Sequence, residues 1–392
     1  MKRRLLWVGD AAVDSGFAKV THSILTHLVP DWDIFILGIN YLGDPHPYPY
    51  QIFPAYPGGD GFGLKRMREV IGKVGPDIVV VQNDPWNIRA YMDRAISRPV
   101  VAIMPVDGRN CKATGLNGLA MAVFWTQFGL QEAREGGYVG PATVIPLGVD
   151  TSIYKAMPRE EARKIVGLPA RMKDGFIIGT VNRNQPRKRF DLLVLYFCEW
   201  VKTRQVNDAF LFIHTCPTPD DAYDVQQLMS YFGMKNRLIL SEPGMQEGIP
   251  EEKLAVFYNS FDIMLTTTQG EGWGLTTMEG MACGIPQVIP VWSALGEWAL
   301  PAAAGVRCSS VAATANHGIN VLGGIMDKQE ALTTLDQLYG DPLLRSNLEV
   351  QGIELVNQQQ FRWKNIAAQY SRVFDEVYVN RFDTRGEVVV NA

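Results

Sequence analysis

Residues 261–284 read FDIMLTTTQGEGWGLTTMEGMACG. The stretch opens with an apolar run typical of a buried strand, continues as a glycine-rich loop and closes with the periodicity of a helix. Gly270, Gly272 and Gly274 let a ligand approach the backbone closely. A helix that begins near Leu275 directs free N–H groups and the positive end of its dipole at this loop, so the pattern predicts an anion site.

Two glutamates flank this predicted site. Glu271 lies in the loop, and Glu279 follows eight residues later in the helix. A carboxylate accepts two hydrogen bonds from a pair of adjacent hydroxyl groups. Two carboxylates beside an anion site therefore suit a ligand with two polyol ends and a diphosphate between them, which describes a nucleotide sugar. The alternative is a helix-start carboxylate at Glu271 and an exposed helix residue at Glu279.

The alternation of strand and helix patterns extends through the chain and predicts an α/β fold with parallel sheets. A polar stretch with Pro158 and Pro169 separates two series of elements. We therefore expect two doubly wound domains of similar size, with ligands at the carboxyl ends of the strands. The expected strands lie at 5–8, 34–39, 77–81, 100–104 and 123–126, and then at 175–181, 210–214, 238–241 and 262–267.

The composition is typical of a globular protein in water. The chain has 392 residues, 47% hydrophobic and 20% charged, and 37 Lys and Arg against 41 Asp and Glu give a net charge of −4. These values exclude a disordered, collagen-like or disulfide-stapled chain and argue against a dedicated polyanion binder. Five dispersed cysteines without C-x2-C spacing, and no apolar run of about 18 residues, favour a cytoplasmic protein without structural zinc.

Several cofactor motifs are missing from the sequence. No G-x-G-x-x-G opens a helix after a strand and no G-x4-G-K-[ST] occurs, which argues against a dinucleotide oxidoreductase and a P-loop enzyme. The one D-x-D, Asp31-Trp-Asp33, precedes a strand, at the wrong end of a sheet for a ligand. We interpret it as a solvated turn and expect neither a metal nor a cofactor, with the nucleotide sugar as a substrate.

The 261–284 stretch resembles the E-x7-E motif of family-four retaining glycosyltransferases. These have the GT-B fold, in which two Rossmann-like domains face each other across a cleft. The resemblance covers most of the chain and implies an N-terminal acceptor-side domain over 1–165, a donor-binding domain over 166–365, and a C-terminal helix and tail over 366–392 that pack back toward the N-terminal domain. The other segments similar to the family are Ser15-Gly-Phe-Ala18, Thr126-Gln-Phe-Gly129, Ile145–Lys155 and Gly179–Asp191.

By this resemblance, Arg183 and Lys188 bind the donor diphosphate, while Glu271 binds the transferred sugar and Glu279 the ribose. A departing diphosphate carries negative charge that must be stabilised, and the two cations with the start of the helix take the place of a metal ion. A solvated basic turn over 187–189 is the alternative. The predicted donor-binding residues are Gly16, Arg183, Lys188, Gly272, Trp273, Gly274, Leu275 and Glu279.

Asp107 marks a departure from the family. Many members carry a histidine near the reacting sugar, at the end of an N-domain strand, whereas this segment reads Pro99-Val-Val-Ala-Ile-Met-Pro-Val-Asp-Gly-Arg109. Asp107 is a sugar or acceptor ligand, a general base or a structural turn residue. With Glu271, Arg183 and Lys188 it forms the set of candidate catalytic residues. Retaining members are thought to use the donor phosphate to take the acceptor proton, so no protein nucleophile is expected.

Acceptor-side residues are expected in loops rich in aromatic and polar side chains. Tyrosine rings with polar tips suit stacking on sugars or bases, and residues that follow a strand face the ligand edge of a sheet. The alternatives are a loop that packs on its own domain and ordinary turn chemistry. The candidates are Tyr48, Tyr50, Asn83, Asp84, Trp86 and Arg109.

The sequence thus predicts a retaining, metal-independent glycosyltransferase that uses a nucleotide sugar, with a UDP- or GDP-sugar favoured. The acceptor hydroxyl belongs to a saccharide, a lipid-linked sugar, a protein, a metabolite or a modified DNA base. The alternatives are a nucleotide-sugar epimerase or phosphorylase and an inactive nucleotide-sugar-binding module. The basic helix expected over 64–74 suggests weak contact with a membrane surface, or else simply covers the sheet. No obligate protein partner is implied.

Overall fold

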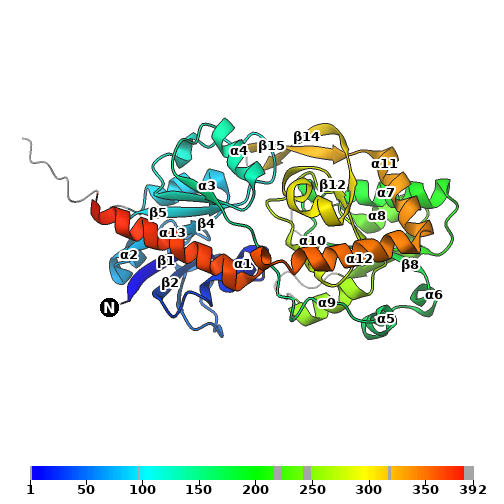
Figure 1. Ribbon diagram of the computed structural model, residues 1–392, viewed down its shortest axis with the longest axis horizontal. Coiled ribbons are helices and arrows are strands. Elements are labelled where there is room, and N and C mark those ends of the chain that lie inside the picture. The colour runs from blue at the N-terminus through cyan, green and yellow to red at the C-terminus, as the bar shows by residue number, and fades with distance from the viewer. Residues whose placement is uncertain (1, 96, 216–222, 242–248, 317–318, 384–392) are drawn as a thin grey trace, which may run out of the picture. The chain divides into compact units, whose positions relative to one another are not determined.

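The computed structural model describes residues 2–95, 97–215, 223–241, 249–316 and 319–383 (Figure 1). The chain divides into two compact units. Unit 1 consists of Met1–Val106, Cys111–Leu147 and Arg362–Ala392, and unit 2 of Asp107–Asn110 and Gly148–Phe361. From the sequence, the boundaries are expected near residues 165 and 365 and residues 107–110 in the first domain, whereas the structure groups residues 107–110 with unit 2. None of the described helices combines the length and the apolar character needed to span a bilayer.

Unit 1 is built on a seven-stranded sheet with the strand order β3-β2-β1-β4-β5-β6-β7, in which all neighbours are parallel. The strand order reverses between β1 and β4, the kind of place where doubly wound sheets bind ligands. The strands are β1 (Arg3–Asp10), β2 (Trp32–Ile39), β3 (Gln51–Pro54), β4 (Ile78–Gln82), β5 (Val100–Met104), β6 (Met121–Phe124) and β7 (Ala142–Val144). The helices are α1 (Gly16–Leu25), α2 (Met67–Val74), α3 (Pro85–Met92), α4 (Gln127–Glu135) and α13 (Trp363–Asp383).

The central strands of unit 1 are apolar along their whole length, as expected where helices cover both faces of a parallel sheet. Residues 5–8 of β1 and all of β4 and β5 are buried. Helix α13, from the far end of the chain, packs against α1 and β4. There Phe374 lies edge-on to Trp32 with ring centroids 6.1 Å apart. The last described helix is therefore part of the core of unit 1.

Unit 2 contains a six-stranded sheet with the order β10-β9-β8-β11-β12-β13, also parallel throughout. Its strands are β8 (Phe176–Val181), β9 (Ala209–His214), β10 (Leu238–Ser241), β11 (Ile263–Leu265), β12 (Gln287–Pro290) and β13 (Ala304–Val306). Its helices are α5 (Arg159–Val166), α6 (Ala170–Lys173), α7 (Phe190–Thr203), α8 (Val225–Tyr231), α9 (Glu251–Asn259), α10 (Leu275–Ala282), α11 (Lys328–Gly340) and α12 (Pro342–Val356). The two parallel sheets confirm the α/β class predicted from the alternation.

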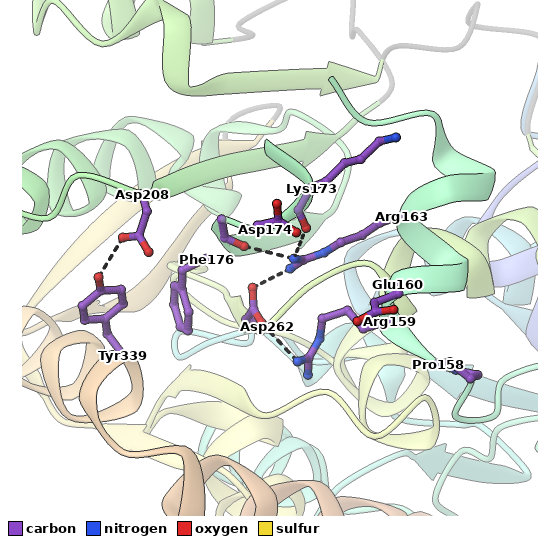
Figure 2. A pocket seen from close by; sticks show the side chains of 11 residues that line it. Pro158, Arg159, Glu160, Arg163, Lys173, Asp174, Phe176, Asp208, Asp262 and Tyr339 are labelled. Carbon is purple, nitrogen blue, oxygen red and sulfur yellow. Dashed lines mark hydrogen bonds and ion pairs between the residues drawn. The ribbon is translucent and has the colours of Figure 1, made fainter. Parts of the chain in front are cut away.

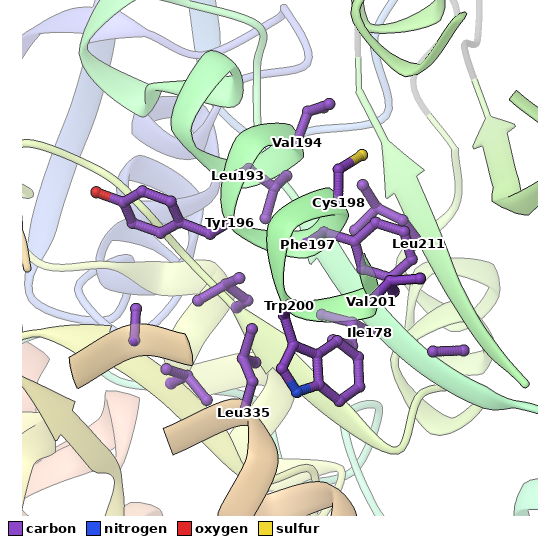
Figure 3. Close-up of a cluster of buried hydrophobic side chains, with 14 of the residues drawn as sticks. Ile178, Leu193, Val194, Tyr196, Phe197, Cys198, Trp200, Val201, Leu211 and Leu335 are labelled. Atoms are coloured by element: carbon purple, nitrogen blue, oxygen red, sulfur yellow. The ribbon is translucent and has the colours of Figure 1, made fainter. Parts of the chain in front are cut away.

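Helix α7 supplies much of the core of unit 2 (Figure 3). Leu193, Phe197 and Trp200 recur at helical spacing and are buried in one cluster with Ile178 of β8 and Leu211 of β9. Burial of each such side chain stabilises the fold by roughly 1.5–3 kcal/mol. This packing fixes the start of α7, and with it the loop that joins β8 to α7.

An antiparallel hairpin lies outside the parallel sheet of unit 2. Its strands are β14 (Cys308–Asn316) and β15 (Ile319–Met326). No strand is predicted over this segment from the sequence, and the structure corrects that omission. Seven of the 17 residues of these strands are alanine, serine or glycine, so the segment lacks the regular alternation of large apolar and polar residues that indicates a strand.

Candidate functional site

The site is built on the loop between β11 and α10, where two glycines are required by the backbone. Gly274 adopts φ 93° and caps the N-terminus of α10. A Cβ atom on Gly270 would lie 1.9 Å from the carbonyl oxygen of Asp107. No other residue fits this approach, so the Asp107 segment packs directly on the loop.

Glu271 is buried in this loop among polar partners. Its carboxylate pairs with the Lys188 ammonium and accepts a 3.1 Å hydrogen bond from an Nη atom of Arg187. Its backbone N–H donates to the Ser293 hydroxyl at 3.0 Å. The glutamate is thus held at both its carboxylate and its backbone.

Arg187 and Lys188 reach Glu271 from the 3₁₀ turn Pro186–Lys188, between β8 and α7. The Arg187 guanidinium also donates to the Gly270 carbonyl oxygen at 2.9 Å and lies 3.2 Å from the Asp107 carboxylate. One arginine therefore joins two of the predicted catalytic carboxylates. Together the four side chains carry two positive and two negative charges.

The electrostatics keep this cluster ionic. Burial opposes ionisation of Glu271, but the charges of Lys188 and Arg187 outweigh it and lower the pKa of the carboxyl to about 2. Burial, together with the neighbouring Arg187 cation, lowers the pKa of Lys188 to about 8, although Glu271 works against this shift. Both groups are therefore ionised at neutral pH, and Lys188 is the one whose charge changes in mild alkali.

Glu279 lies on α10, where it is buried and held by a hydrogen bond from a tyrosine of a neighbouring helix. The Tyr258 hydroxyl of α9 donates to its carboxylate at 2.6 Å. Tyr154 packs edge-on to the Tyr258 ring, with centroids 6.0 Å apart. Burial, and next the Glu279 charge, raise the pKa of Tyr258 well above its usual range, so its hydroxyl remains a proton donor.

The other predicted donor-binding residues have different surroundings. Arg183 follows β8, and its side chain is exposed. Trp273 is buried, with its ring stacked on Trp298 at 5.0 Å. Gly272 is buried and Leu275, the first residue of α10, half-buried.

Gly16 and three acceptor-side candidates follow the carboxyl ends of β1 and β4 in unit 1. Gly16 is the first residue of α1, after the cap residue Ser15. The Asn83 side chain accepts hydrogen bonds from the Asp84 N–H and from the Asn87 amide, and so forms the turn into α3. Trp86, in that helix, is half-buried.

The remaining acceptor-side candidates are also in contact with protein groups. Tyr48 stacks on His22 with ring centroids 3.5 Å apart, and Tyr50 lies parallel to the same imidazole at 5.9 Å. Arg109 belongs to unit 2, where its guanidinium lies 4.8 Å from the ring centroid of Trp292. The two tyrosines thus already use ring faces for stacking within unit 1.

Three residues of the site are absent from the sequence-based set: Arg187, Ser293 and Tyr258. Arg187 was visible in the basic run beside Lys188, but a run of three cations does not show which one turns toward a carboxylate. Ser293 and Tyr258 carry no motif, because their partners lie 22 and 21 residues away. Within the described residues, no three His, Cys, Asp or Glu side chains gather in a way that could hold a metal ion.

A polar pocket lies elsewhere in unit 2, at the amino ends of the strands (Figure 2). There the buried Arg163 pairs with Asp262 at 2.6 Å, and Arg159 pairs with the same carboxylate at 3.2 Å. The Tyr339 hydroxyl donates to Asp208 at 2.7 Å. These contacts join helices α5 and α11 to the sheet, at the edge opposite to that used by ligands in this fold class.

The architecture belongs to a known structural class. No protein-family model matches the sequence. Sucrose-phosphate synthase from Thermosynechococcus elongatus is similar over 97% of this chain and 100% of that chain, with a TM-score of 0.74 and 16% identity. The Anabaena protein HepE, solved in complex with UDP and glucose, is similar over 95% and 100% of the two chains, with a TM-score of 0.67 and 15% identity. These likenesses show the GT-B fold.

In sequence, the chain is a homologue of glycosyltransferases. The D-inositol 3-phosphate glycosyltransferase of Acidothermus cellulolyticus is 29% identical over 150 residues, which are 37% of this chain and 32% of that protein. The protein of the same name from Thermobispora bispora is 25% identical over 240 residues, 60% of this chain and 50% of the relative. The chain therefore spans half or less of the length of these relatives.

Proposed function

We propose that the chain is a retaining glycosyltransferase that transfers a sugar from a nucleotide-diphosphate sugar to a hydroxyl acceptor without a metal ion. The observation that carries the proposal is the Asp107–Arg187–Glu271–Lys188 cluster, which lies where β8 and β11 end and α10 begins. This is the ligand-binding edge of a doubly wound sheet. The homology to glycosyltransferases supports the same reaction class.

In the proposed reaction, the bond between the sugar C1 and the β-phosphate oxygen breaks, and a bond between C1 and the acceptor oxygen forms on the same face. The acceptor proton passes to the departing phosphate oxygen. The nucleoside diphosphate leaves with the bonding electron pair, so negative charge grows on its oxygens. Cations and helix N–H groups aimed at that charge stabilise the transition state.

Lys188 is suited to stabilise the leaving group because its contact with Glu271 uses only one of the N–H donors of its ammonium group. An ammonium has three N–H donors, and one of them contacts Glu271. The others can bind a diphosphate oxygen beside the start of α10. Arg183, exposed on the same β8–α7 loop, is the proposed second cation for the diphosphate. Glu271 binds hydroxyls of the transferred sugar, and Glu279 binds those of the ribose.

The donor is proposed to be a UDP- or GDP-sugar. The acceptor classes remain those predicted from the sequence, and the names of the relatives add inositol phosphates and sugar phosphates to the compounds to test. We also propose weak contact of the helix over 64–74 with a membrane surface. A modified DNA base is a further proposed acceptor. In the structure, Met67, Val70 and Val74 of this helix are buried.

The test is a thermal-shift screen with UDP-, GDP-, ADP- and TDP-sugars, since a specific ligand raises the melting temperature. Transfer is then assayed with the stabilising donor, and the anomeric configuration of the product is determined by NMR. We expect retention, full activity with EDTA present, and loss of transfer in Glu271→Ala. Activity that EDTA abolishes and Mg²⁺ or Mn²⁺ restores would contradict the metal-free reaction.

The same assays separate the alternative functions. An epimerase converts the donor without an acceptor, and a phosphorylase needs inorganic phosphate as the second substrate. A binding module raises the melting temperature with a nucleotide sugar but gives no product over the whole acceptor panel. Each of these outcomes would replace the proposed transfer reaction.

A further inference from the structure

Gln269 lies two residues before Glu271, and its backbone and side-chain polar groups all form hydrogen bonds within unit 2. Its backbone N–H donates to the Arg187 carbonyl oxygen at 2.8 Å, and its own carbonyl oxygen accepts from the Gly324 N–H at 2.9 Å. Its side-chain oxygen accepts from the Thr314 hydroxyl at 2.7 Å, and its side-chain nitrogen donates to the Ala312 carbonyl oxygen at 3.1 Å. The residue is 4% exposed, so its groups serve the protein rather than a ligand.

Three of these four bonds come from the β14–β15 hairpin, and the same hairpin holds the Asp107 segment. The Arg109 N–H donates to the Leu322 carbonyl oxygen at 2.9 Å, and the Leu322 N–H donates back to Arg109 at 3.1 Å. The Asn110 amide donates to the Asn320 carbonyl oxygen at 2.7 Å. One hairpin therefore fixes the backbone beside both carboxylates that Arg187 joins.

The close approach of the hairpin depends on glycine at two positions. A Cβ atom on Gly323 would lie 2.5 Å from the Cβ atom and the carbonyl oxygen of Gln269. A Cβ atom on Gly108 would lie 2.4 Å from the Leu322 carbonyl oxygen. Neither contact leaves room for a side chain without a shift of the backbone.

We propose that the hairpin is a positioning element for the transfer site and that Gln269 is the positioning residue that links it to Glu271. The inference rests on the proposed function, because the group that it positions is the proposed sugar ligand. Displacement of a reacting group by about 1 Å can lower a rate by roughly 100-fold. Gln269 acts through the placement of Glu271, while the diphosphate is bound by other residues.

The test compares Gln269→Ala and Thr314→Val with the parent protein. Thr314→Val removes a single hydrogen bond and keeps the shape of the side chain, so it tests the link if Gln269→Ala does not fold. We expect kcat for transfer to fall at least about tenfold in Gln269→Ala and by about threefold in Thr314→Val. The KM for the nucleotide sugar should stay within about twofold of the parent value. The control is Gln329→Ala, at an exposed position of α11.

A second pair of variants tests the contact sterically. Gly323→Ala should lower kcat in the same way, because its methyl group displaces Gln269. Gly340→Ala is the matched control, since a Cβ atom there meets nothing within 4 Å. Amide hydrogen exchange, read over the peptide 266–274, should be faster in Gln269→Ala, Thr314→Val and Gly323→Ala than in the parent and both controls.

Hydrogen exchange separates the inference from the proposed function, because it requires no turnover. If the parent protein transfers no sugar, the proposed function fails, while the exchange rates still show whether the hairpin orders the Glu271 loop. Unchanged exchange in folded variants would overturn the positioning role. A lower melting temperature with parental kcat would also overturn it, since that result describes a merely structural contact.

Discussion

The Arg187 guanidinium lies 3.2 Å from the carboxylate of Asp107, the residue that stands where the resemblance to family-four glycosyltransferases implies a histidine. The same guanidinium contacts Glu271 at 3.1 Å. A carboxylate thus stands where the resemblance implies an imidazole, and the Arg187 guanidinium balances its charge. This pairing brings Asp107 into the proposed active site and leads to the first prediction.

Asp107→Asn should lower kcat for transfer by about tenfold or more, because it removes a charge that orients Arg187 beside the reacting sugar. The KM for the nucleotide sugar should change by less than about threefold, since the diphosphate is bound elsewhere. Steady-state kinetics with a saturating acceptor measure both values. The control is Asp336→Asn, which removes the partner of Arg204 from an ion pair of 3.6 Å on the surface. A parental kcat in Asp107→Asn would exclude a role in transfer and would leave Asp107 as a structural turn residue.

Removal of one partner of the Lys188–Glu271 pair should lower the free energy of unfolding strongly. Replacement of both partners by apolar residues should lower it much less. Glu271→Leu leaves a buried ammonium without its carboxylate, so we expect the free energy of unfolding to fall by roughly 3–5 kcal/mol. Lys188→Met combined with Glu271→Leu should recover most of that loss, because no charge stays buried without its partner. Urea denaturation at pH 7 compares both variants with the parent, and neither variant should transfer sugar. Equal stability of Glu271→Leu and the parent would contradict the buried pair.

The rate should depend on pH through Lys188. Its pKa is lowered to about 8, chiefly by burial, and only the protonated ammonium stabilises a departing diphosphate. The value of kcat/KM for the nucleotide sugar should therefore be constant below this pKa and fall as pH rises through it. In Lys188→Arg the guanidinium stays charged, so the alkaline fall should disappear whatever the absolute rate. A fall near pH 8 that survives in Lys188→Arg would assign the titration to another group.

Tyr258→Phe should weaken donor binding more than it slows transfer. The variant removes the 2.6 Å hydrogen bond that orients the Glu279 carboxylate. A hydrogen bond to a charged group contributes about 1.5–3 kcal/mol. We expect the dissociation constant of the nucleoside diphosphate to rise at least about tenfold, measured by calorimetry, with kcat within about threefold. Tyr231→Phe, at a position that is 79% exposed, is the control, and an unchanged affinity in Tyr258→Phe would show that Glu279 does not bind the ligand.

The sequence was sufficient to predict those features that depend on local patterns. The alternation of apolar runs predicted the two parallel sheets, and the glycine loop before α10 followed from the spacing of Gly270, Gly272 and Gly274. The partners of Arg187 could not be predicted in this way, because Asp107 and Glu271 lie 80 and 84 residues from it in the chain. The hairpin was missed because its small residues lack a clear period, and its function depends on a contact between Gln269 and Thr314.

The discontinuity of unit 1 has a consequence for synthesis on the ribosome. Helix α13, which packs against α1 and β4, is encoded after the whole of unit 2. During translation, unit 2 has its full sequence once Phe361 has been added, whereas unit 1 still lacks the helix that covers Trp32. Domains usually fold from the N-terminus during synthesis, but here the N-terminal unit is completed last. Until α13 has been added, the Trp32 ring lacks its edge-on contact with Phe374.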